Sequence, residues 1–97
     1  MEPLDFTWDP AKALRNIQAH SVSFEEARTV FWDEDAVLIS DSDHSYGEDR
    51  FLLLGMSSSP RLLVVVHCYR ESETKIRLIS ARKATRNEEI TYARRWI

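Results

Sequence analysis

The chain has 97 residues, which suits one small domain with a modest core, and we expect residues 1–97 to form a single domain. Hydrophobic residues make up 43% of the sequence and only two Gly and three Pro are present, so disordered and collagen-like classes are excluded. The one cysteine, Cys68, excludes an internal disulfide, and the longest aliphatic run, 62–66, is far shorter than the roughly 20 residues that cross a bilayer. We therefore expect a cytoplasmic protein that does not enter a membrane.

The formal net charge of −3 is unevenly distributed along the chain. Residues 1–60 contain four basic and twelve acidic residues, a net charge of −8, whereas residues 61–97 contain nine basic and four acidic residues, a net charge of +5. This asymmetry favours a cationic region that attracts a polyanion. The alternative is that the two halves neutralise each other across the fold.

The first part of the chain predicts two short helices. Residues 6–8 are compatible with a short strand, and Asp9-Pro10 is a typical N-cap followed by proline at the first helical position, which predicts a helix over 10–20. A capping-box pattern, Ser23-x-x-Glu26, and apolar residues at helical spacing predict a second helix over 24–32. Because the two helices are close in sequence, we expect an N-terminal helical hairpin.

The rest of the chain has the pattern of a sheet followed by a helix. Four β-branched or apolar runs lie at 36–40, 50–54, 62–69 and 75–81. Their connections are turn-rich and too short for helical crossovers, so we predict a four-stranded antiparallel sheet. Its third strand is apolar on both faces and should be central. A second capping box, Thr85-x-x-Glu88, opens a C-terminal helix that should reach about Arg95, and the fold class is therefore α+β.

No motif of the sequence requires a metal or a cofactor. The acidic run that begins Asp41-Ser-Asp43 resembles a calcium loop, but an EF-hand needs Gly and Glu where this chain has Tyr46 and Leu52. Turn-forming residues explain the run better as a hairpin loop. No Gly-rich phosphate loop and no zinc-binding pattern is present, so we expect neither a metal site nor a cofactor.

Lys12, Asn16 and His20 form one polar stripe on the first predicted helix. The opposite face carries Leu14 and Ile17, which we expect to be buried. On its own the stripe is typical of a solvated helix face, with His20 favoured near the helix end by the helix dipole.

Cationic and hydroxyl side chains gather around the predicted strand-to-helix junction at 80–86, where they could bind a phosphate group. The alternative is an ordinary Arg-rich surface. We also expect polar residues of the last two strands to converge on one end of the sheet: His67, Tyr69, Arg70, Arg77, Ser80 and Arg82.

Motifs along nearly the whole chain together resemble one protein family. They are Phe6-x-Trp8-Asp9-x-x-Lys12-x-x-x-Asn16-x-x-x-His20, Phe24-Glu25-x-Ala27-x-x-x-Phe31, Glu48-x-Arg50, Gly55, Tyr69, Arg77-x-Ile79-Ser80-Ala81-Arg82-Lys83-Ala84, Glu88-Glu89 and Tyr92. The chain resembles the BrnT family of toxins. One departure is Ser21, because the histidine before it is commonly followed by Gly in such sequences.

The resemblance implies a RelE-like toxin of a type II toxin–antitoxin system, a metal-independent endoribonuclease that cleaves RNA and inhibits translation and growth. Its protein partner would be a BrnA-like antitoxin, and operator DNA would be contacted only through that antitoxin. In such an enzyme the 2′-hydroxyl attacks the adjacent phosphorus, so protons must move and phosphoryl charge must be stabilised. The alternative function is a non-catalytic toxin-fold subunit that serves as a protein-interaction or co-repressor module.

The resemblance also implies roles for individual residues. Arg70 and Arg82 match basic positions of the family and would grip the scissile phosphate, since arginine keeps its charge at neutral pH. His67 and His20 are candidates for proton transfer on chemical grounds, because imidazole titrates near neutrality. RNA-binding residues would be Ser80, Lys83, Arg77, Arg86, Lys12 and Tyr92, although Tyr92 could equally pack on the sheet.

Overall fold

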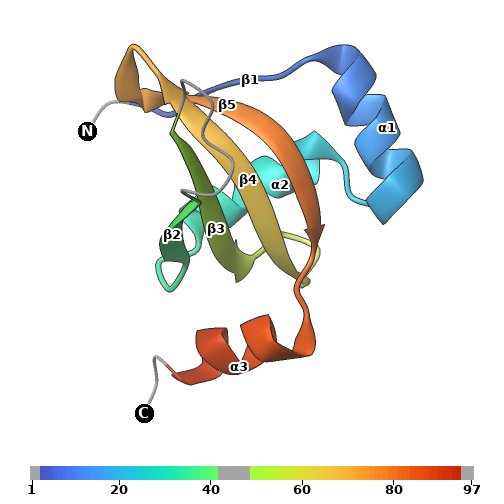
Figure 1. Ribbon diagram of the computed structural model, residues 1–97, viewed down its shortest axis with the longest axis vertical. Coiled ribbons are helices and arrows are strands. Elements are labelled where there is room, and N and C mark those ends of the chain that lie inside the picture. Colours follow the sequence, from blue (N-terminus) through green and yellow to red (C-terminus); the bar gives the residue numbers. More distant parts are fainter. Residues whose placement is uncertain (1–2, 42–48, 95–97) are drawn as a thin grey trace.

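The computed structural model describes residues 3–41 and 49–94 (Figure 1). The acidic hairpin loop and the Arg95 end of the last predicted helix extend outside these residues. Within them the chain forms, in order, β1 (Asp5–Thr7), α1 (Pro10–His20), α2 (Phe24–Thr29), the 3-10 turn η1 (Val30–Trp32), β2 (Val37–Asp41), β3 (Arg50–Met56), β4 (Leu62–Arg70), β5 (Ser72–Lys83) and α3 (Arg86–Ala93).

The sheet has five strands in the order β1-β5-β4-β3-β2, so the predicted four-stranded antiparallel sheet is wrong. Strands β2 to β5 pair antiparallel, and β4 is central, as its apolar faces predicted. The additional strand, β1, pairs parallel with β5, with Phe6 opposite Ile76. The short strand expected at 6–8 is thus present one residue earlier, but its partner lies some seventy residues away, so local sequence could not reveal that it joins the sheet.

The predicted N-terminal helical hairpin is also wrong. Both α1 and α2 pack mainly against β5, and Figure 1 shows them running in different directions, with α2 behind the sheet. The link between them is part of the core, since Val22 is fully buried, as are Phe24 and Ala27 of α2. Closeness in sequence therefore did not make the helices partners, because α2 buries its apolar residues on the sheet and α1 is held to β5 by hydrogen bonds of Asn16.

The predicted helix starts and the end of the first helix are confirmed by their caps, whereas the second α-helix, predicted to reach 32, stops at Thr29 and continues as the 3-10 turn η1. The Asp9 side chain accepts a hydrogen bond from the Ala11 amide (2.9 Å), and the helix stops at His20 because Ser21 adopts left-handed backbone with φ of 57°. Ser23 caps α2 through the Glu26 amide, and Thr85 and Glu88 form the capping box of α3.

The faces of α1 are the reverse of those predicted. Leu14 is 58% exposed and Ile17 is 45% exposed, whereas Asn16 is buried. The Asn16 side chain faces β5 beyond Thr7, the last residue of β1, where it donates to Ala81 O (2.8 Å) and accepts from Ala81 N (3.0 Å). The backbone N–H and C=O of Ala81 at the sheet edge need hydrogen-bond partners, and this need, rather than the apolar periodicity of α1, decides how the helix is oriented.

The third helix, α3, lies below one end of the sheet and has no buried residue (Figure 1). Polar contacts hold it: Glu88 pairs with Arg82 of β5, and the Tyr92 hydroxyl donates to Asp33 Oδ2 (2.6 Å). None of the helices in the described residues is long and apolar enough to cross a membrane.

Candidate nucleic-acid interface

The two faces of the sheet separate the polar residues of β4 and β5. One face packs against α2 and contains the core residues Val65, Leu78 and Ala81, whereas α1 lies beside the edge of β5 (Figure 1). The opposite face, which we call the distal face, carries the alternate residues. Cys68 and Arg77 are cross-strand partners on it, and so are Val66 and Ser80.

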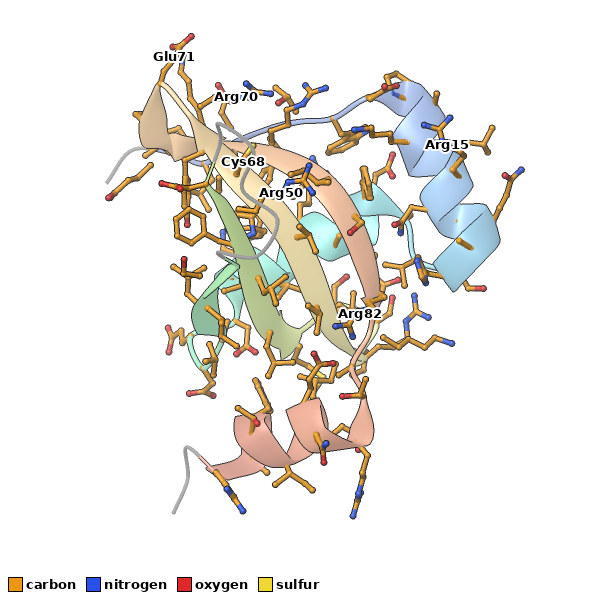
Figure 2. All side chains as sticks on the ribbon, viewed as in Figure 1. Arg15, Arg50, Cys68, Arg70, Glu71 and Arg82 are labelled. Carbon is orange, nitrogen blue, oxygen red and sulfur yellow. The ribbon has the colours of Figure 1, made fainter. Side chains whose placement is uncertain are left out.

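Three arginines surround Cys68 on the sheet. Arg77 is its partner on β5, and the pairing of Phe51 with His67 places Arg50 beside it on β3. Arg70 follows two residues further along β4, and Figure 2 shows Arg50, Cys68 and Arg70 in the same part of the sheet. We call Arg50, Arg70 and Arg77 the arginine cluster.

The spacing within the arginine cluster suits one phosphodiester group. With strands about 4.8 Å apart, the Arg50 and Arg77 backbones lie roughly 10 Å from each other, and Arg70 is about 7 Å along the strand from Cys68. Long arginine side chains can converge across such a gap on one anion. Arg70 is exposed, and neither Arg50 nor Arg77 forms an ion pair with another described residue.

Arg82 lies far from Arg70, although both were predicted to grip the same phosphate. It pairs with Val64, six residues before Arg70 on β4, which is a separation of about 20 Å along the strand; Figure 2 shows the two at opposite ends of the sheet. Both Arg82 terminal nitrogens donate to the Glu88 carboxylate, at 2.8 and 3.0 Å. Arg82 therefore anchors α3, and its hydrogen bonds hold the pKa of Glu88 at about 2.

His67 is fully buried on the face that packs against α2 and η1, so it is not on the distal face with Cys68 and Arg77. Its ring contacts Phe31 edge-on, with centroids 4.8 Å apart, and its nitrogens lie 3.1 Å from Val65 O and 3.4 Å from the Tyr69 hydroxyl. Burial lowers the pKa of His67, which keeps the imidazole neutral. These contacts are typical of a packed core histidine.

The remaining predicted site residues are dispersed. Lys12 and His20 lie on α1 beside a surface hollow. Ser80 is half-buried on the distal face, whereas Lys83 and Arg86 are exposed near the start of α3. The Tyr92 hydroxyl bond to Asp33 favours packing for this side chain, the second of the two roles considered for it.

The predicted convergence at one end of the sheet therefore holds for His67, Tyr69, Arg70 and Arg77, although His67 and Tyr69 face the core; Ser80 and Arg82 lie further along the strands. Sequence reasoning missed Arg50 as a site residue. One feature of the sequence could have indicated Arg50. It begins a predicted strand in which every second residue is apolar, so its side chain lies on a definite face of the sheet. Among the described residues no group of three His, Cys, Asp or Glu side chains could hold a metal ion.

One ion pair between described residues joins the acidic and basic halves of the chain, that of Glu26 with Arg61. Arg61 Nε donates to Glu26 Oε2 (2.9 Å), and this bond lowers the pKa of Glu26. Among the described residues, neutralisation between the two halves is thus local to Glu26 and Arg61.

The small α+β domain gathers arginine side chains at one end of its sheet, as proteins that bind a polyanion such as RNA do. The chain belongs to the BrnT family, whose members are ribonuclease toxins of type II toxin–antitoxin systems: the sequence model of that family matches residues 8–88. The family and activity expected from the sequence are thereby confirmed. The protein is an RNA-cleaving toxin, and an antitoxin is its partner.

A solved structure supports the same fold. The 1.1 Å crystal structure of the Brucella abortus ribonuclease toxin, BrnT, is similar to this chain with a TM-score of 0.63, covering 86% of this chain and 99% of that one at 18% sequence identity. No curated protein sequence matches this chain at a significant level.

Proposed function

We propose that the chain cleaves RNA on the distal face of its sheet, with the arginine cluster holding the scissile phosphate. The observation that carries this proposal is the placement of Arg50 and Arg77 on either side of Cys68, with Arg70 at the adjacent strand end. Guanidinium groups bind phosphate oxygens in a bidentate manner and remain charged at every physiological pH. This assignment keeps Arg70 and Arg77 from the sequence prediction and gives Arg82 the role of holding α3.

The reaction we propose is an internal phosphoryl transfer. The ribose 2′-oxygen loses its proton and bonds to the adjacent phosphorus, the bond from phosphorus to the 5′-oxygen breaks, and that oxygen takes up a proton. The products are a 2′,3′-cyclic phosphate and a 5′-hydroxyl end, so atoms and charges balance without a metal. The arginine cluster stabilises the negative charge that accumulates on the phosphoryl oxygens during this step.

The biological setting follows from this activity. Cleavage of messenger RNA in the cytoplasm would inhibit translation and stop growth. We propose a BrnA-like antitoxin as the neutralising partner, with operator DNA bound through the antitoxin. The whole chain, residues 1–97, would act as a single toxin domain.

The test is cleavage of RNA by the purified, antitoxin-free chain in EDTA. Arg70→Ala and Arg77→Ala should each lower the cleavage rate about 10²- to 10³-fold, the effect of removing one group that stabilises transition-state charge. The matched control is Arg28→Ala, since Arg28 is exposed on α2, away from the distal face. Circular dichroism melting checks that each variant is folded.

Two results would overturn parts of the proposal. Full activity in both variants would remove the arginine cluster from the reaction, and loss of wild-type activity in EDTA would overturn the metal-independent mechanism. Expression of the chain alone should also stop cell growth, and expression together with the antitoxin should restore it.

A further inference from the structure

A second group of cations lies outside the arginine cluster, on α1. A surface hollow of about 290 Å³ separates this helix from β5, and its lining residues are Lys12, Arg15, Asn16, Ala19, His20 and Ile79. No acidic residue lines it. The charged side chains that line the hollow are therefore all basic, although the chain as a whole has a net charge of −3.

The cations of the hollow are available to a ligand. Lys12, Arg15 and His20 are exposed, and none of the three forms an ion pair with another described residue. Figure 2 shows Arg15 projecting from α1. An anion in the hollow would thus replace solvent around these groups without breaking an existing contact.

The hollow is built on rigid elements. Asn16 is buried at its floor, and its side chain bonds to both backbone polar groups of Ala81 and to Val22 O (2.8 Å). These three bonds fix α1 against β5, so Lys12 and Arg15, one turn or less from Asn16, are held at a fixed place beside the sheet. Because its own polar atoms are all used, Asn16 positions the cations and does not itself bind the ligand.

A bulge in β5 connects the hollow to the arginine cluster. His67 pairs with Leu78 and Val66 with Ser80, so Ile79 is the extra residue and lies against the hollow. Arg77 of the arginine cluster is only two residues away, about 7 Å along the strand. An extended polyanion that leaves the cluster across β5 reaches the hollow next.

We infer that the hollow between α1 and β5 binds a backbone phosphate of the same RNA strand, flanking the phosphate that is cleaved. This inference rests on the proposed function, because the RNA strand is taken to run from the arginine cluster toward the hollow. Lys12 and Arg15 supply the charge, His20 a further hydrogen-bond donor, and Ile79 an apolar contact for the neighbouring sugar. Such phosphate contacts position a strand without reading its sequence.

The experiment measures how the affinity for a short single-stranded 2′-deoxy oligonucleotide depends on salt. This probe lacks the attacking hydroxyl, so binding is measured whether or not the chain cleaves RNA. Each neutralised phosphate contributes about 0.7 to the slope of log affinity against log salt for single strands, so the double variant K12Q/R15Q, which removes the one phosphate contact of the hollow, should reduce that slope by about 0.7. Arg28→Gln, the matched control on α2, should leave the slope at its wild-type value.

The outcomes separate this inference from the proposed function. An unchanged slope and affinity in K12Q/R15Q would overturn the inference, even if the wild-type chain cleaves RNA. A reduced slope in a chain that cleaves no RNA would overturn the proposed mechanism and leave the phosphate site standing. Both substituted side chains are exposed and make no contact with the Asn16 bonds, so thermal melting should match the wild type.

Discussion

Replacement of Asn16 by Leu tests whether one side chain holds α1 on the sheet. The substitution nearly preserves volume and removes three hydrogen bonds of 2.8, 2.8 and 3.0 Å. It leaves both polar groups of Ala81 and the Val22 carbonyl buried without these partners. Each bond contributes about 0.5–1.5 kcal/mol, and an unsatisfied buried group costs toward the upper end of that range, so we expect a loss of about 3 kcal/mol in the free energy of unfolding.

The assay is urea denaturation followed by circular dichroism, with thermal melting as a second measurement. For a domain of this size about 1 kcal/mol shifts the melting temperature by about 4–8 °C, so Asn16→Leu should lower it by roughly 12–24 °C. The matched control is Asn87→Leu, the same chemical change at an exposed position of α3, which should stay within about 0.5 kcal/mol of the wild type. If Asn16→Leu costs no more than Asn87→Leu at an unchanged denaturant slope, the side chain does not anchor α1 and the reasoning is refuted.

A variant that changes charge rather than size sharpens this test. Asn16→Asp keeps an acceptor for the Ala81 amide but turns a carboxylate oxygen toward two carbonyl oxygens. Burial and these dipoles should raise the pKa of the new carboxyl, because they disfavour its charged form. The variant should therefore be most destabilised at neutral pH and recover part of its stability as the pH falls and the carboxyl regains a proton to donate. Equal destabilisation at every pH would contradict this account.

Three further predictions concern other sites. The hydrogen bonds with Arg82 lower the pKa of Glu88 from 4.5 to about 2, so the stabilisation from this pair is complete above pH 4.5 and is lost as the pH falls toward 2. The urea midpoint of Glu88→Gln should therefore depend less on pH over that range than that of the wild type. An unchanged pH dependence would contradict the assignment. Burial lowers the pKa of His67 below 6.5, so the folded chain disfavours its protonated form and the free energy of unfolding should fall as the pH drops below 6.5. His67→Phe should remove this contribution to the pH dependence of the free energy of unfolding. If the full pH dependence persists, it belongs to another group. Ser21 has a φ of 57°, so Ser21→Gly should raise the free energy of unfolding by about 1 kcal/mol in the same assay, whereas a loss would show that the serine makes a compensating contact.

Local signals predicted the elements of this fold well. The Asp9, Ser23 and Thr85 caps marked the helix starts, because a cap is satisfied by an amide only two or three residues away. Alternation and apolar runs found the four longer strands to within a few residues, and apolarity on both faces of β4 predicted its central place. The family motifs predicted the activity, since they extend over most of the chain.

The candidate site was only partly predictable. Sequence patterns singled out Arg70 and Arg77, but they could not show that Arg82 pairs with Glu88 and holds α3. They also could not show that β4 turns His67 toward the helices while its neighbour Cys68 lies between Arg50 and Arg77 on the other face. The face of a strand residue is fixed by register and by what covers the sheet, and both depend on distant segments.

The sequence by itself determined where helices and strands form, the small α+β class and the family, because these depend on residues that are near one another or on motifs that can be read directly. Tertiary structure alone decided that β1 joins β5 in parallel, that α1 buries Asn16 instead of Leu14 and Ile17, and that Arg82 pairs with Glu88. The Asn16 bonds to Ala81 span 65 residues, and the need to satisfy that sheet edge outweighs the helix's own apolar pattern. The three buried backbone groups that Asn16 satisfies would cost about 1–3 kcal/mol each without a partner, more than the roughly 1.5–3 kcal/mol lost by leaving Leu14 and Ile17 about half exposed. The distant contact therefore sets the orientation of the helix and, with it, the position of its cations.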